Sequence, residues 1–292
     1  MENLMREKKK NMGLVLLFVV GLSILLYPTV SNTWNEYRAK RLISAYRASV
    51  SEEAELEMYT EMLEEAREYN GSLAREAVPD AFSVRDGIED EEYEALLNLR
   101  GDGVMGSVEI PAIGVDIPIY HYTTEDSLQK GAGHLFGSSL PVGGEGTHTI
   151  LSAHRGLPSA ELFTDLPLLE EGDVFYLHVL NETLAYEVDQ KLTVLPGEVG
   201  ALAITEGEDY ATLVTCTPYA INSHRVLVRG HRIPFVEETY AKEQRQTSKK
   251  DTGRMLLQVL SAAAGLAVAA VIVRVISILD DRKRKKRRND KE

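Results

Sequence analysis

Two long apolar segments near the ends of the chain limit how it can fold. Met12–Val30 is almost uncharged and follows a basic N-terminus, whereas Met255–Leu279 precedes the strongly basic run DDRKRKKRRNDKE. Segments of this length are typical of membrane-spanning helices, and Lys and Arg clusters mark the cytoplasmic side. We therefore predict a transmembrane helix at each end, both termini in the cytoplasm, and about 224 intervening residues, 31–254, on the extracellular face.

Each segment has an alternative interpretation. A cleaved signal peptide is the alternative for the first, but the following SNTWNEYRAK lacks a clear small-x-small cleavage site, which favours an uncleaved anchor. Arg274 interrupts the second segment near its basic end, where a long side chain can reach the headgroups.

Charge is divided along the same boundaries. Residues 1–30 and 255–292 together carry +7, so with −13 for the whole chain the intervening residues carry −20. A strongly acidic domain argues against nucleic acid as a partner and is compatible with cationic partners or with solubility alone.

The residues after the first segment have a helical pattern that ends at a turn-rich stretch. Apolar residues recur at three- and four-residue spacing from about Thr33 to Asn70, and Ser51 before two glutamates resembles an N-cap. This pattern predicts two helices with a break near Val50. The stretch from Ser72 to Asp90 is expected to form a long loop.

From Gly106 onward the sequence consists of short β-type runs separated by Gly, Pro and Asn. The runs are GSVEIP, VDIPIYHY, HTILSAH, DVFYLHVL, TLAYEVDQKLTVLP, YATLVTC and HRVLVRGHRI. Seven or eight such strands favour a closed barrel. SLQKGAGHL is expected to form a short helical turn, the stretch from Ser159 to Leu169 a short helix, and 237–252 a polar linker.

Cys216 is the one cysteine of the chain, so it cannot form an internal disulfide. It ends the apolar run TLVTC, and a Pro-containing loop separates it from Arg225, which opens the next run. A lone cysteine is often a small buried hydrophobe. A thiol at a strand end with a guanidinium close by is also a candidate nucleophile.

Most of the seven histidines are expected to be structural or exposed. His121, His134, His178 and His231 have no paired carboxylate or second ligand at metal-binding spacing, and no metal site is predicted. His148 and His154 bracket HTILSAH with an even spacing, so a regular strand would place both on one face. His224 should point away from the face that Arg225 serves.

The segments TILSAHRG and TLVTCTPYAINSHRVLVRGHR closely resemble the signature segments of the sortases, membrane-anchored cysteine transpeptidases of Gram-positive bacteria. The resemblance covers nearly all of the extracellular part, including ELFTDLPLLEEGDVFYLHVL. It implies a mainly β fold, a closed eight-stranded sortase-type β-barrel with short helices and an N-terminal helical extension. The catalytic set that it implies is His154, Cys216 and Arg225.

Two features resemble class C, the pilus-building branch of that family. One is the second membrane segment, and the other is VPDAFSV, which is similar to the class C lid motif. The resemblance implies that Asp80 of the lid pairs with the catalytic Arg and that Phe82 covers the Cys. Ala81 departs from the usual Pro, and Ala153 and Ala220 stand where many members have Gly.

The resulting organisation has eight parts. They are a cytoplasmic N-terminus (1–11), an anchor (12–30), a helical region (31–71), a loop with the lid (72–104), the catalytic barrel (105–236), a linker (237–254), a transmembrane helix (255–279) and a basic cytoplasmic tail (280–292).

The residue chemistry fits acyl transfer without a cofactor. A free thiol is only a few per cent ionised at neutral pH, and charge on His154 or Arg225 would lower its pKa. The Arg225 guanidinium is suited to stabilise an oxyanion, and the His154 imidazole is suited to act alternately as general acid and general base. The resemblance implies partners that are pilin subunits bearing LPxTG-like signals, cut between Thr and Gly, and acceptor lysines.

Three alternatives stay open. A housekeeping-type sortase would attach surface proteins to peptidoglycan, and a non-catalytic membrane scaffold would only bind pilins. A papain-like hydrolase is disfavoured because such enzymes place Cys before His in the chain.

Overall fold

The computed structural model describes residues 2–50, 56–73, 80, 82 and 90–245, together with isolated positions farther on. These fall into a larger unit, Tyr27–Glu243, and a second unit made of both chain ends. The predicted segment 255–279 and the basic tail lie largely outside the described residues, as do the lid positions Pro79 and Ala81.

The N-terminal region is helical, with a break where the sequence predicts one. Helix α1 spans Glu2–Val50, and α2 begins at Leu56 and spans Leu56–Ser72. The first predicted membrane segment and the predicted helical region after it form one continuous helix, with Pro28 inside it. Of the described helices, one holds a stretch apolar and long enough to cross a membrane, Leu16–Val50.

Both helices contact the barrel through buried polar side chains. The Tyr46 hydroxyl of α1 donates to the Met105 carbonyl at 2.8 Å and accepts from the Leu180 amide at 2.9 Å. At the end of α2, the Asn70 side chain donates to the Leu140 carbonyl and accepts from the Leu140 amide. Because these groups are buried, their pairing fixes where each helix lies on the barrel.

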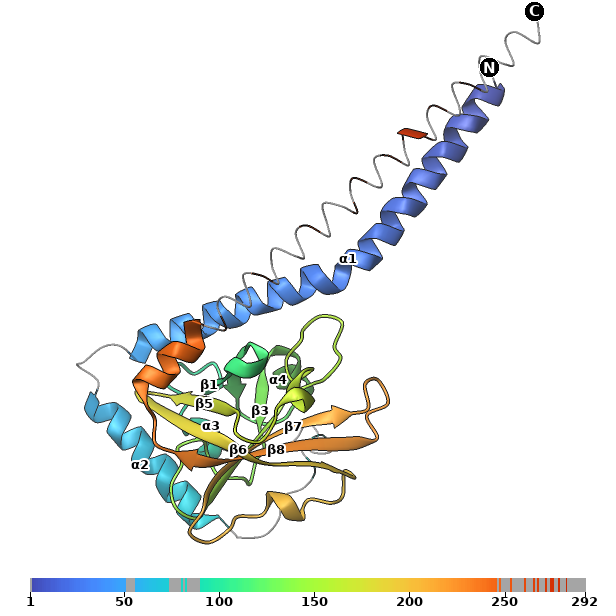
Figure 1. The fold of residues 1–292 in the computed structure, drawn as a ribbon. Coiled ribbons are helices and arrows are strands. Elements are labelled where there is room, and N and C mark those ends of the chain that lie inside the picture. The colour runs from blue at the N-terminus through green and yellow to red at the C-terminus, as the bar shows by residue number, and fades with distance from the viewer. Residues whose placement is uncertain are drawn as a thin grey trace, which may run out of the picture. The chain divides into compact units, whose positions relative to one another are not determined.

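Eight strands close into the predicted barrel (Figure 1). They are β1 (Val104–Ile110), β2 (Val115–Tyr120), β3 (Ala132–His134), β4 (Thr147–Ser152), β5 (Val174–Val179), β6 (Glu182–Val194), β7 (Asp209–Thr217) and β8 (His224–Ile233). Their order around the barrel is β1-β2-β3-β4-β7-β8-β6-β5. The β2–β3 and β4–β7 pairs are parallel, and the other pairs are antiparallel.

Short elements differ most from the sequence-based expectations. The predicted turn SLQKGAGHL contains most of helix α4 (Glu125–Lys130) but also strand β3, whose three residues are too few to show an alternating pattern. The predicted loop 72–104 contains helix α3 (Glu91–Ala95). The helix expected between 159 and 169 is only a 3-10 turn, Leu166–Leu168, and the predicted linker begins as a helix at 237–245.

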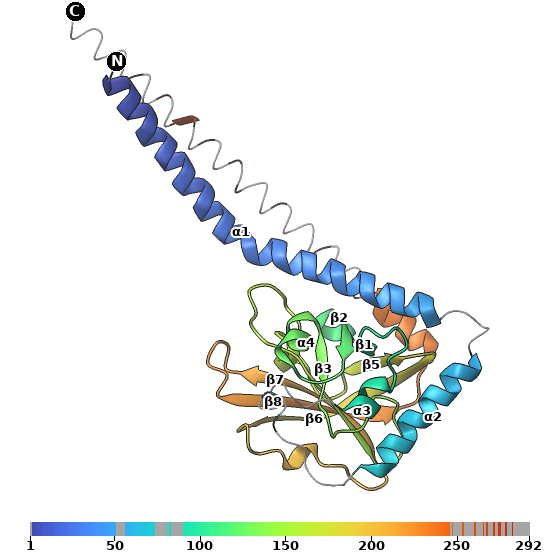
Figure 2. The ribbon, with the colours of Figure 1, turned by 180° about the vertical axis from the view of Figure 1, so that it is seen from behind.

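Helix α3 closes one side of the barrel beside α2 (Figure 2). Its Tyr93 side chain is fully buried, lies 6.0 Å from the Tyr69 ring of α2 by ring centroids, and bonds His134 Nδ1 at 2.7 Å. The barrel interior is filled by apolar side chains from all around the sheet, among them Met105, Ile119, Phe175, Tyr186 and Val228. Such filling leaves the rims of the barrel, and the loops on them, as the places where chemistry can occur.

Candidate active site

Cys216 and Arg225 are direct cross-strand partners. β7 and β8 are antiparallel neighbours, and the register places Cys216 opposite Arg225 and Thr217 opposite His224. The nine-residue spacing in the sequence is therefore a tight connection, residues 218–223, between two paired strand ends. Residues directly opposite on an antiparallel pair have Cβ atoms about 4.5–5.5 Å apart. The Arg225 side chain thus starts at the position directly beside Cys216. Cys216 itself is buried, with 6% of its surface exposed.

His154 lies at the same rim of the barrel, just beyond the end of β4. β4 runs parallel to β7, and the pairing continues past the strand because the Ala153 amide donates to the Val214 carbonyl at 3.2 Å. The Thr215 hydroxyl donates to the Ala153 carbonyl at 2.8 Å. Parallel neighbours end at one edge, so the residue after Ala153 and the residue after Thr215 are brought to the same rim. These residues are His154 and Cys216.

The loop that follows His154 is held by several hydrogen bonds and by a close backbone approach. The Phe163 amide donates to the His154 carbonyl, and Arg155 bonds the Thr164 carbonyl and the Thr217 hydroxyl. Gly156 has φ +80°, and a Cβ added there would lie 2.6 Å from the Tyr219 ring. Both the conformation and the close approach require glycine at this position.

The two predicted lid residues, Asp80 and Phe82, lie on this rim. The Asp80 carboxylate accepts two hydrogen bonds from Arg225, Nε to Oδ1 at 2.8 Å and Nη2 to Oδ2 at 2.9 Å. Their side chains are only 9% and 11% exposed. The Phe82 ring lies 5.0 Å from the Arg225 guanidinium carbon and 6.0 Å from the His154 ring centroid. The lid therefore contacts both the predicted oxyanion group and the predicted acid and base.

The thiol is not activated in this arrangement. Burial raises the pKa of Cys216, Arg225 opposes that rise, and Asp80 adds to it, with a net increase above the usual thiol value. The sequence-based expectation of a lowered thiol pKa is wrong for this state. The main physical reason is that burial disfavours the thiolate, and the negative charge of Asp80 near the sulfur adds to this effect.

Arg225 is held in its charged form by the same contact. Burial acts to lower the pKa of Arg225, but the hydrogen bonds to Asp80 and the charges of Cys216 and Asp80 together outweigh it, and the net pKa is raised. Further bonds from Nη1 to the Asn222 and His224 carbonyls fix the guanidinium within its own loop.

Sequence reasoning missed one acidic side chain at this rim. His154 Nε2 lies 3.3 Å from Oε2 of Glu125, which is on α4. Glu125 is 29 residues before His154 in the chain, and no spacing rule links an exposed carboxylate on a short helix to a loop after a later strand. The contact depends on how β3 and β4 pair.

The other histidines are mostly structural, as expected. His134 is fully buried between the Tyr93 hydroxyl and the Ser139 carbonyl, and burial lowers its pKa to about 4. His148 bonds the Ala203 carbonyl and the Thr212 hydroxyl, so it faces away from the rim, and the strand ends before His154. His178 does have a paired carboxylate, Glu109, at 3.1 Å, contrary to the prediction. The two residues are 69 positions apart and meet only because β1 pairs with β5.

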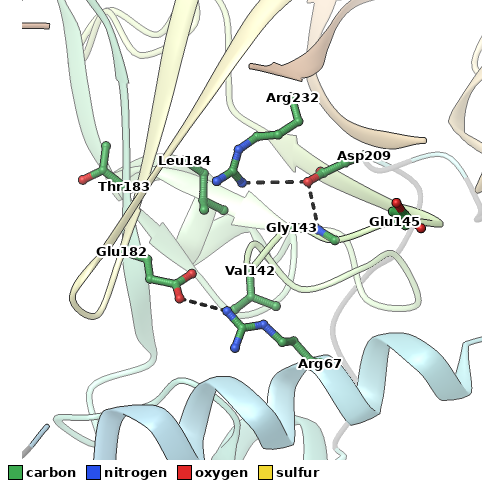
Figure 3. A pocket seen from close by; sticks show the side chains of 10 residues that line it. Arg67, Val142, Gly143, Glu145, Glu182, Thr183, Leu184, Asp209 and Arg232 are labelled. Atoms are coloured by element: carbon green, nitrogen blue, oxygen red, sulfur yellow. Dashed lines mark hydrogen bonds and ion pairs between the residues drawn. The ribbon is translucent and has the colours of Figure 1, made fainter. Parts of the chain in front are cut away.

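Within the described residues, no group of three or more His, Cys, Asp or Glu side chains is arranged to hold a metal ion. A separate open pocket of about 660 Å³ lies where β7 begins, at the end of that strand opposite Cys216 (Figure 3). Four of its charged side chains form two pairs, Arg67 with Glu182 and Arg232 with Asp209.

Known proteins are similar to this chain in sequence and in fold. Residues 108–233 match the family model of the sortase domain. Sortase A of Bacillus anthracis is 30% identical over 127 residues, which are 44% of this chain and 59% of that protein. The chain thus matches less than two thirds of the length of that relative.

Solved structures match over almost their full length. A sortase C of Streptococcus pneumoniae is 48% identical with a TM-score of 0.62, covering 68% of this chain and 98% of that one. Sortase C2 of pilus island 1 from group B Streptococcus is 47% identical with a TM-score of 0.57, covering 61% and 99%. Sortase C-1 of Actinomyces oris is 41% identical with a TM-score of 0.59, covering 61% and 99%. The chain therefore belongs to the sortase family, and within it to class C.

Proposed function

We propose that this chain polymerises pilin subunits through a covalent thioacyl intermediate on Cys216. The acyl donor is an LPxTG-like signal cut between Thr and Gly, and the acceptor is a lysine amine of the next pilin. The observation that carries the proposal is the register that pairs Cys216 with Arg225, together with the two bonds from Arg225 to the lid. Solved relatives described by their pilus island or by pilin substrate specificity support the substrate class.

In the first step Cys216 gives its proton to His154, and the resulting thiolate attacks the carbonyl carbon of the signal threonine. The bond from sulfur to carbon forms, the bond from that carbon to the glycine nitrogen breaks, and the leaving amine takes a proton from His154. Arg225 stabilises the oxyanion that develops on the carbonyl oxygen, which a permanently charged planar guanidinium suits.

In the second step the lysine nitrogen attacks the thioester. An isopeptide bond forms, the sulfur leaves as thiolate, and His154 accepts the proton lost by the amine. The alternation of one imidazole between acid and base balances the protons over the cycle. No organic cofactor is needed for either step.

The lid has to leave the rim before the first step. While Asp80 is hydrogen-bonded to Arg225, the guanidinium cannot donate to a substrate carbonyl. In the same arrangement the pKa of the Cys216 thiol is raised, so less of it is present as the nucleophilic thiolate. We infer that the described arrangement is a resting state, with Asp80 and Phe82 displaced when the sorting signal enters.

The proposed location is the cell membrane, with the barrel on the extracellular face and both termini in the cytoplasm. The apolar stretch within α1 supports an N-terminal anchor. The second span, 255–279, rests on its composition and on the basic tail after it. The proposed domain bounds are those predicted from the sequence, with α1 before the barrel in the chain and the helix 237–245 after it.

The experiment combines the full chain in detergent micelles with pilins from the same cell that carry LPxTG-like signals. We expect a covalent pilin ladder, with a Thr-to-lysine isopeptide identified by mass spectrometry. Cys216→Ala, His154→Ala and Arg225→Ala should each abolish the ladder while thermal unfolding shows a retained fold.

Other products point to other functions. A product joined to lipid II in place of a pilin lysine identifies a cell-wall-anchoring sortase. No reaction of Cys216 with a substrate-derived electrophile, alongside retained pilin binding, identifies a scaffold and overturns the proposal.

A further inference from the structure

The acidic side chain that faces the predicted acid and base comes from a helix that sequence reasoning did not connect with the site. Glu125 Oε2 lies 3.3 Å from His154 Nε2, within reach of a charge-assisted hydrogen bond. The imidazole is only 20% exposed, and the tilted Phe82 ring lies 6.0 Å from it by ring centroids. The imidazole thus has a carboxylate at Nε2 and the Phe82 ring beside it.

Glu125 is itself held in place. Its second oxygen, Oε1, accepts a hydrogen bond from the Gln129 side chain one turn later on α4, at 2.8 Å. Thr124 caps the helix by accepting from the Ser127 amide, and Leu128 anchors it as a buried side chain. The carboxylate is therefore oriented before any substrate arrives, although it is 63% exposed to solvent.

The fold keeps α4 and His154 in a fixed relation. α4 leads through Gly131 into β3, and β3 pairs with β4 so that Gly133 lies opposite Ser152, two residues before His154. Gly131 itself is close against β2, since a Cβ there would lie 2.4 Å from the Pro118 carbonyl oxygen. Few rearrangements are open to this connection, so the contact between Glu125 and His154 belongs to the barrel architecture.

We propose that Glu125 is a positioning residue for His154, holding the tautomer in which Nε2 carries the proton and leaving Nδ1 to exchange protons with substrate amines. This inference rests on the proposed acid and base role of His154. During amine departure and attack, the imidazole alternates between neutral and protonated forms. A carboxylate that accepts the N–H of the far nitrogen keeps the ring orientation constant through both steps.

The size of the effect follows from exposure. Because Glu125 is largely in solvent, water and salt screen its charge, and exposed ion pairs of this kind contribute modestly. We expect Glu125→Gln to lower kcat for peptide cleavage about 2- to 5-fold and to leave KM unchanged, since the sorting signal is bound by other groups.

The same variant has a spectroscopic signature. Gln129 donates to Oε1, so in Glu125→Gln the carbonyl oxygen of the new side chain should stay beside Gln129. Its amide nitrogen then faces His154 Nε2 as a donor, which requires the opposite tautomer. We expect nitrogen NMR of histidine-labelled full chain in micelles, above neutral pH, to show His154 shifting from the Nε2–H toward the Nδ1–H tautomer. His154→Ala assigns the signal.

Asp126→Asn is the matched control. Asp126 is the next residue of α4, is 78% exposed, and pairs with Lys130. The substitution removes the same charge from the same turn, yet leaves the contact with His154 intact. It should change neither kcat nor the tautomer.

The outcomes separate this inference from the proposed function. A tautomer change without a loss of kcat overturns the positioning role, and so does a loss of kcat without a tautomer change, which would be a structural effect. Equal behaviour of the two variants overturns it as well. Activity that survives His154→Ala overturns the proposed function, while the tautomer measurement still reports whether Glu125 orients the ring.

Discussion

Removing the charge of Asp80 should make Cys216 more reactive. Asp80 contributes to closure through its two bonds to Arg225, and both side chains are almost completely buried in that contact. Asp80→Asn keeps the size and shape of the side chain but removes the charge and one of the two good acceptors. The substitution therefore makes the closed arrangement less stable relative to the open one.

The magnitude follows from the strength of the hydrogen bonds that the substitution removes or weakens. Hydrogen bonds to charged groups contribute about 1.5–3 kcal/mol, and every 1.4 kcal/mol is about a factor of ten in a population. If labelling requires the lid to open, the rate should rise about 10- to 150-fold. The change in thiol pKa acts in the same direction, because Asp80 raises the pKa of Cys216 and the variant removes that contribution.

The assay is simple because Cys216 is the one cysteine. Full chain in micelles is treated with a small alkylating reagent at neutral pH, and the second-order rate is measured by mass spectrometry. Asp189→Asn is the control, since Asp189 makes an equivalent two-bond contact with Arg229, four residues along β8 from Arg225. Unchanged labelling in Asp80→Asn, or an equal rise in Asp189→Asn, refutes the reasoning.

Three further predictions concern stability. The pKa of His134 is about 4 in the folded chain and about 6.5 in the unfolded chain, so acid protonates the unfolded chain first. The free energy of unfolding should therefore keep its full value above pH 6.5 and fall by about 2 kcal/mol from pH 7 to 5. Urea unfolding at both pH values checks this, and His134→Gln should flatten the dependence. Ala220 has φ +64°, so Ala220→Gly should stabilise the fold by up to about 1 kcal/mol, whereas Ala153→Gly, in ordinary buried backbone, should destabilise it; equal signs in thermal unfolding would contradict this. Tyr240 donates to Glu109 at 3.0 Å, so Tyr240→Phe should cost about 1 kcal/mol in chemical denaturation, and no loss relative to the exposed Tyr37→Phe would argue against a role for that bond.

The sequence predicted those features that depend on neighbouring residues. Alternating apolar runs located seven of the eight strands, and the break near Val50 falls where α1 ends. The spacing from Cys216 to Arg225 corresponds to one turn between two strands, so a local pattern was enough to bring these side chains together.

Features that depend on distant pairing were not accessible in the same way. β3 is three residues long, and β-type periodicity needs more residues than that to be recognised. The partners Glu125 for His154 and Glu109 for His178 are supplied by strands that meet only in the closed barrel. The thiol pKa was misjudged for a related reason, since it is raised mainly by burial in the closed barrel and further by Asp80, which is 136 positions away in the chain.

In the hairpin between β7 and β8, the pairing of the strands and the sequence of the connection have separate roles. The backbone ladder sets Cys216 opposite Arg225. The connection adds two contacts, since the Asn222 carbonyl accepts a hydrogen bond from Arg225 and the Tyr219 ring lies close to Gly156. The Ile221 side chain is 71% exposed and takes part in neither contact. Position 221 can therefore vary, in nature or by design, while Cys216 and Arg225 stay in place.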